Sequence, residues 1–82
     1  MIRVLLFAAL RDAAGRDCIE LPAQPQDTAR SLWDRLRSDC PALNSFTART
    51  RVAVNGKYAS WEAEVQPGDE VVFFPPVSGG VR

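Results

Sequence analysis

The two most apolar stretches of this chain lie near its two ends, at residues 2–7 and 71–74. Each is an almost continuous run of Val, Leu, Ile and Phe. Such a run is typical of a strand buried on both faces, or of one whose second face meets a partner. The 82 residues have room for one domain. We therefore expect the first and last strands to lie side by side at the centre of one sheet.

Charged residues within these runs indicate which face of the sheet is open. Because side chains alternate along a strand, Arg3 shares a face with Leu5 and Phe7. By the same rule Glu70 shares a face with Phe74. Either a loop covers this face or it exposes an apolar patch, which on a small monomer is usually a partner site. In the second case Phe74 joins Leu5, Phe7 and Tyr58 in the predicted apolar patch.

The segment after the first run has the pattern of a short helix and a second strand. Ala8–Ala14 is rich in helix formers and closes at Gly15, a residue that commonly ends helices. Apolar and polar residues then alternate over Arg16–Leu21, with Ile19 and Leu21 facing inward. We expect this strand to pair antiparallel with the first.

One main helix is expected in the middle of the chain. Asp27 or Thr28 can cap its start, and Pro41 disfavours helical geometry at Cys40, so the helix ends at Cys40 or just before it. Apolar residues recur at helical spacing and form one stripe that can cover a sheet face, with Trp33 in the core. The stripe consists of Ala29, Leu32, Trp33, Leu36 and Cys40.

The rest of the chain predicts an irregular stretch and then three strands. Pro41–Thr50 has no regular pattern, and Leu43 and Phe46 are its expected anchors on the core. The following elements are strands at 51–54, 57–59 and 70–74, with a hairpin turn at Asn55-Gly56 and a second turn at 66–69. This order predicts a ubiquitin-like β-grasp, an α+β fold in which one main helix crosses a mixed sheet of about five strands.

Composition excludes several classes of function. Ten basic residues balance ten acidic ones, so bulk electrostatics would not hold the chain on a nucleic acid or an anionic membrane. The chain has no histidine, and its carboxylates are scattered among basic residues. We therefore expect no catalytic site of its own, no metal site and no bound cofactor. Cys18 and Cys40 favour two reduced thiols, and the absence of a signal peptide favours the cytoplasm.

The stretch after the last strand carries the most distinctive chemistry. Pro75-Pro76 cannot extend a ladder and favours a stiff backbone that carries Val77 and the residues after it away from the domain. Ser78-Gly79-Gly80 has almost no side-chain bulk, so it can thread a narrow channel. A glycine carboxyl is also the least hindered acyl group that a chain can offer to an activating enzyme. We expect a domain over 1–76 and a flexible tail over 77–82.

Several motifs resemble one family, the small subunit of molybdopterin synthase (MoaD). The resemblance runs from Met1 to Gly80, and its most specific part is the closing stretch Phe73-Phe74-Pro75-Pro76-Val77-Ser78-Gly79-Gly80. The other matching motifs are Phe7-Ala8-x-x-Arg11, Gly15, Val54-Asn55 and Gly68-Asp69-Glu70-Val71.

The resemblance implies a non-catalytic carrier of sulfur. In that family a ubiquitin-activating-like adenylyltransferase uses ATP to adenylate the terminal glycine, which is then converted to a thiocarboxylate. The tail enters the active site of the large subunit, in a heterotetramer, and donates sulfur to cyclic pyranopterin monophosphate to make molybdopterin. By this match Gly80 would carry the thiocarboxylate and Gly79 would permit entry. Phe7, Tyr58 and Phe74 occupy positions that resemble the family's hydrophobic contact surface.

The chain departs from the family where Val81 and Arg82 follow the second glycine. With these residues attached, Gly80 has no free carboxyl to adenylate. Three accounts are open: a protease removes both residues, the chain has lost carrier activity, or such processing is a normal step of the pathway. We favour removal by a protease, because every upstream feature needed to present the tail is present.

Other functions also stay open. The chain could carry sulfur for thiamine synthesis or transfer-RNA thiolation, although the full helix and the Phe-Phe-Pro-Pro spacer favour the molybdopterin synthase subunit. It could be a protein modifier joined to lysines through Gly80. Finally, it could be a β-grasp interaction module without covalent chemistry, whose role would survive deletion of Gly79 and Gly80.

Overall fold

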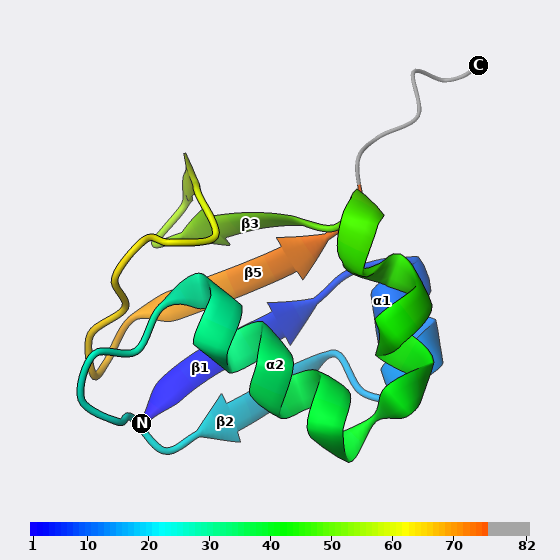
Figure 1. Ribbon diagram of the computed structural model, residues 1–82, viewed down its shortest axis with the longest axis horizontal. Helices are drawn as coiled ribbons and strands as arrows, with labels where there is room; N and C mark the ends of the chain where they lie inside the picture. The colour runs from blue at the N-terminus through cyan, green and yellow to red at the C-terminus, as the bar shows by residue number, and fades with distance from the viewer. Residues whose placement is uncertain (76–82) are drawn as a thin grey trace.

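The computed structural model describes residues 1–75, which form one sheet covered on one face by helices (Figure 1). The elements, in chain order, are β1 (Ile2–Leu6), α1 (Ala9–Ala14), β2 (Cys18–Leu21), α2 (Ala29–Asp39), the 3-10 helix η1 (Pro41–Arg49), β3 (Arg51–Val54), β4 (Lys57–Ala59) and β5 (Glu70–Phe74).

The sheet has the order β2-β1-β5-β3-β4, so the first and last strands lie at its centre, as predicted. β1 and β5 run parallel, with Val4 opposite Val71. The pairs β1–β2, β3–β5 and β3–β4 are antiparallel. The helix α2 crosses one face of the sheet (Figure 1). This is the predicted ubiquitin-like β-grasp arrangement, in which a mixed sheet holds one main helix.

The core lies between α2 and the sheet. Burial alternates along β1 and β5, and the side chains of Val4 and Phe73 are fully buried. Trp33 of α2 packs into this layer, with its ring centroid 5.1 Å from that of Phe73 and 5.9 Å from that of Trp61. Its indole Nε1 donates a hydrogen bond to Thr47 Oγ1 at 2.9 Å, so the buried ring leaves no polar atom unpaired. The prediction that Trp33 belongs to the core is confirmed.

The ends of α2 follow from local side-chain chemistry. The Thr28 side chain accepts a hydrogen bond from Ser31 N at 3.2 Å, and Ser31 Oγ accepts one from Thr28 N at 2.9 Å. This reciprocal capping box satisfies backbone groups that the first helical turn leaves unpaired. At the other end Cys40 is the C-cap, directly before Pro41. Both predicted boundaries are confirmed, with Thr28 and not Asp27 as the cap.

The two predicted turns are also present. Asn55 and Gly56 have φ values of 51° and 84°, the positive pair that a type I′ hairpin turn requires. In the second turn Gly68 has φ 90°, and Asp69 N donates to Gln66 O at 3.0 Å. These turns fix the register of β3–β4 and the start of β5.

Three boundaries predicted from the sequence are wrong. Pro41–Thr50 is not irregular, because Pro41–Arg49 forms the 3-10 helix η1, which begins at a proline and buries Leu43. Such a helix repeats every three residues and gives no 3.6-residue apolar period to detect. β1 ends at Leu6 instead of Phe7, and β2 begins at Cys18 instead of Arg16.

Candidate functional site

The face of the sheet opposite α2 carries a row of side chains in register across all five strands. Leu5 lies opposite Cys18 on one side and opposite Val72 on the other. Val72 pairs with Ala53, and Ala53 pairs with Tyr58. Paired residues project to the same face of a sheet, so these five share one surface. We call this surface the open face.

A charged row borders the open face at the end where β5 begins. Arg3 lies opposite Glu20 of β2 and Glu70 of β5. The Cys18 side chain, followed by the carboxylates of Glu70 and Glu20, raises the pKa of the Arg3 guanidinium above its usual value. Arg3 and Glu70 therefore do mark the open face, as the sequence predicted.

Aromatic residues occupy the other end of the open face, where β5 ends. Phe74 lies opposite Arg51, and its ring centroid is 5.8 Å from that of Tyr58. Tyr58 is 87% exposed and Phe7 is 51% exposed, whereas Leu5 and Phe74 are half-buried. The predicted apolar surface of Phe7, Tyr58 and Phe74 is therefore present and, at Phe7 and Tyr58, open to solvent. Within residues 1–75 no loop covers it.

The tail begins directly beside these aromatic residues. Pro75 follows β5 and is half-buried. The other residues predicted to thread a channel or to carry the acyl group lie outside the described residues; they are Pro76, Val77, Ser78, Gly79 and Gly80. The structure thus brings the predicted contact residues together with the base of the tail.

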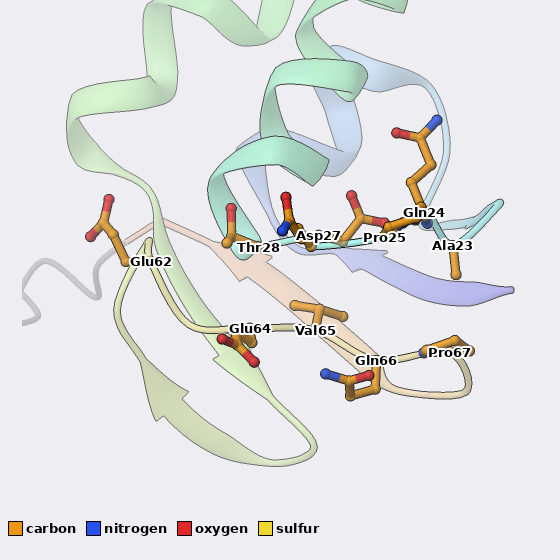
Figure 2. A pocket seen from close by; sticks show the side chains of 11 residues that line it. Ala23, Gln24, Pro25, Asp27, Thr28, Glu62, Glu64, Val65, Gln66 and Pro67 are labelled. Atoms are coloured by element: carbon orange, nitrogen blue, oxygen red, sulfur yellow. Dashed lines mark hydrogen bonds between the residues drawn. The ribbon is translucent and has the colours of Figure 1, made fainter.

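A hollow lies at the other end of the molecule from the base of the tail. A pocket of about 680 Å³ lies between the loop before α2 and the segment before β5, and Figure 2 shows the side chains around it. Its one buried carboxylate, Asp27, accepts hydrogen bonds from Gln24 N at 2.8 Å, Ser31 Oγ at 2.9 Å and Arg35 Nη2 at 2.9 Å. Because these partners satisfy it, Asp27 secures the start of α2 and is not presented to a ligand.

The described residues offer little else for chemistry of their own. Among residues 1–75 there is no group of three or more His, Cys, Asp or Glu side chains that could hold a metal ion. Cys18 and Cys40 are both free thiols, with Cys18 on the open face. None of the helices over residues 1–75 has the length and apolar character needed to cross a membrane.

The sequence alone did not reveal two parts of this site. Arg51 lies opposite Phe74 on the open face, and this placement requires the register of β3 against β5, which the sequence does not give. The ion pair between the buried Asp27 and the half-buried Arg35 joins residues on either side of the helix start, at 2.9 Å. An aspartate directly before a helix cap is its only sequence signal.

Comparison with known proteins gives consistent matches over nearly the whole chain. The model of the ThiS family matches residues 4–80. The molybdopterin synthase sulfur carrier subunit of Escherichia coli is 40% identical over 81 residues, which cover 98% of this chain and 100% of that protein. Small archaeal modifier protein 1 of Haloferax volcanii is 32% identical over 83 residues, covering 92% of this chain and 95% of that protein. The crystal structure of SAMP1 from Haloferax volcanii matches with a TM-score of 0.85 at 31% identity, over 96% of this chain and 98% of that chain.

Proposed function

Since the chain belongs to the ThiS family and to the molybdopterin synthase sulfur carrier subunits, we propose that it carries sulfur as a thiocarboxylate on Gly80. The acceptor of this sulfur is cyclic pyranopterin monophosphate, in the cytoplasmic synthesis of the molybdenum cofactor. The match of the ThiS family extends through residue 80 and so includes both glycines of the tail. The chain is a carrier in this scheme, and its partners supply the catalytic groups.

The acyl chemistry requires a free carboxyl on Gly80, so a protease first removes Val81 and Arg82. A carboxylate oxygen then attacks the α-phosphate of ATP on the activating adenylyltransferase, and pyrophosphate leaves. A hydrosulfide ion displaces AMP from the resulting acyl adenylate and loses its proton, which leaves the thiocarboxylate. ATP is used by the activating enzyme, and the chain itself holds no cofactor.

One observation carries the proposal: the exposed aromatic end of the open face adjoins the residue from which the tail departs. Tyr58 and Phe7 are exposed, and Phe74 directly precedes Pro75. A partner that docks on these side chains is thereby placed at the base of the tail. We propose that the large subunit of molybdopterin synthase docks here, in a heterotetramer, and receives the diglycine in its own active site.

A second candidate function has support of its own. The similarity to small archaeal modifier protein 1 favours a chain that is joined to other proteins through the same activated Gly80. In that case the nucleophile is a lysine amine, and an isopeptide bond forms in place of the thiocarboxylate. Transfer of sulfur to thiamine or transfer RNA would use the same thiocarboxylate with another acceptor, and a pure interaction module would need no Gly80 chemistry.

Reconstitution distinguishes these functions. The chain ending at Gly80, prepared as its thiocarboxylate, is mixed with the large subunit from the same organism and with cyclic pyranopterin monophosphate. We expect formation of the dithiolene product, and none from the Gly80→Ala chain treated in the same way. A complex with the large subunit that forms no product would contradict sulfur donation and would favour the modifier or the interaction module.

A further inference from the structure

Ala8 has a backbone conformation that side chains rarely adopt. Its φ is 53° and its ψ is −125°. This part of backbone space suits glycine, because a Cβ atom there collides with the neighbouring peptide groups. An alanine is strained in such a region, and the conformation persists only where the surrounding structure imposes it.

Ala8 is the second residue of a tight turn that ends the central strand pair. Leu10 N donates to Phe7 O at 3.1 Å, which closes the turn over Phe7–Leu10. The angles of Ala8 match the first central position of a type II′ turn, which glycine normally occupies. After this turn α1 begins at Ala9.

Pro75 leaves the carbonyl of Phe7 free to close this turn. Phe7 N donates to Phe73 O at 3.2 Å, so the parallel ladder of β1 and β5 extends to Phe7. The next bond of a parallel ladder would run from the N–H of residue 75 to the carbonyl of Phe7, and a proline has no N–H. The carbonyl of Phe7 accepts from Leu10 instead. The side chain of Leu10 is fully buried, and it anchors the far side of the turn in the core.

The turn determines where Phe7 points. Phe7 lies one residue beyond the last register pair, Leu6 opposite Phe73, on the face that Arg3 and Leu5 occupy. Its ring is 51% exposed, so packing alone does not fix it. The backbone on its N-terminal side belongs to the sheet, and the backbone on its C-terminal side is the strained turn at Ala8. Both sides are therefore constrained.

We propose that Ala8 is a positioning residue for partner binding, which holds Phe7 in place on the open face beside the base of the tail. This inference rests on the proposed function, because it takes the large subunit of molybdopterin synthase as the partner. A glycine at position 8 would adopt the same turn without strain, but it would also allow other backbone conformations at this position. The alanine narrows these conformations, so Phe7 is ordered before the partner arrives and less entropy is lost on binding.

The proposal predicts effects of opposite sign on stability and on affinity. In Ala8→Gly the midpoint of thermal unfolding rises, because relief of the strain outweighs the added freedom of the unfolded chain. The affinity for the large subunit falls about three- to tenfold, the loss expected when one more side chain must be ordered on binding. A residue with a merely structural role would move both quantities in the same direction.

Titration calorimetry of the purified large subunit with the chain ending at Gly80 measures this affinity. Gln26→Gly is the matched control, since Gln26 also has a positive φ, 63°, but lies in the loop before α2. It should leave the affinity unchanged. In a Phe7→Ala background, Ala8→Gly should have no further effect on affinity, because Ala8 acts through Phe7.

Unchanged affinity in Ala8→Gly, or an equal loss in the Phe7→Ala background, would overturn the proposal. A lowered unfolding midpoint in Ala8→Gly would also overturn it, because Ala8 would then not be strained. Failure of the unmodified chain to bind the large subunit at all is a different result, and it counts against the proposed function.

Discussion

The ring of Tyr58 lies 5.8 Å from the ring of Phe74, centroid to centroid, with 42° between their planes. This contact joins the edge strand β4 to the central strand β5 on the open face. Tyr58 is 87% exposed, so its ring contributes little to the core. The exposed ring of Tyr58 thus contributes little to the stability of the fold and is available for contact with a partner.

Replacing Tyr58 tests this surface. Tyr58→Ala should weaken binding of the large subunit about 30-fold, the effect of losing an aromatic anchor worth about 2 kcal/mol. Its free energy of unfolding should change by no more than about 0.5 kcal/mol, as for other exposed side chains. Lys57→Ala, one residue away and also exposed, is the control and should bind normally. Equal affinities for the two variants would remove Tyr58 from the interface.

A substitution at Gly80 tests the function of the tail independently of the stability of the domain. Gly80→Ala should abolish or cripple sulfur transfer, because the added methyl hinders the tail in a narrow channel, and it should leave the unfolding midpoint unchanged. Gly68→Ala is the matched control. Gly68 has φ 90°, so an alanine there should destabilise the turn before β5 while sulfur transfer by the folded protein continues. An active Gly80→Ala protein would argue against the carrier mechanism.

Thr47 tests the polar contact inside the core. Thr47→Val removes the oxygen that accepts from Trp33 Nε1 and leaves a buried N–H unpaired. We expect a loss of about 1–3 kcal/mol in the free energy of unfolding, measured by urea denaturation. Ser45→Ala, on an exposed part of η1, should be close to neutral. If both variants unfold at the same urea concentration, the indole finds another partner or lies open to water.

Asn55 and Asp69 predict a change of stability in acid. Asn55 Nδ2 donates to Asp69 Oδ1 at 2.9 Å, and Gln66 N donates to Asp69 Oδ2 at 2.8 Å. The Asn55 amide, followed by the Gln66 N–H, holds the pKa of Asp69 below its usual 3.8. Because the folded state lowers this pKa, the stabilisation is complete above 3.8 and is lost as the pH falls through the lower, folded value.

The non-titrating variant Asp69→Asn isolates this contribution. The difference in the free energy of unfolding between the unmodified chain and Asp69→Asn should be constant near neutral pH. It should shrink as the pH falls below 3.8. Thermal unfolding at a series of pH values measures it. A difference that stays constant down to the acid limit of folding would show that the Asn55 contact does not depend on the carboxylate charge.

Features that depend on local patterns were predictable from the sequence. The almost continuous apolar runs predicted β1 and β5, the pair Asn55-Gly56 predicted the hairpin, and Thr28 was one of two predicted starts for α2. The open face followed from Arg3 and Glu70, because two charges in otherwise apolar strands must face water. These signals lie within a few residues of the feature that they predict.

Features that depend on register or on backbone strain were not predictable. The row from Cys18 to Tyr58 exists only because four strand pairs share one register. The strained turn at Ala8 lies where Pro75, which is distant in sequence, ends the ladder of β1 and β5. Likewise the ion pair of Asp27 and Arg35 depends on where the loop before α2 lies against the helix. The short-range sequence pattern around each residue does not indicate these contacts between distant segments.

The intact mass of the native protein, isolated from its own cells while molybdenum cofactor is being made, tests the central claim most directly. We predict a chain that ends at Gly80, without Val81 and Arg82, in which one oxygen is replaced by sulfur. A chain that still carries Val81 and Arg82 under these conditions, with no sulfur added, would contradict the account and would leave a β-grasp interaction module as the function.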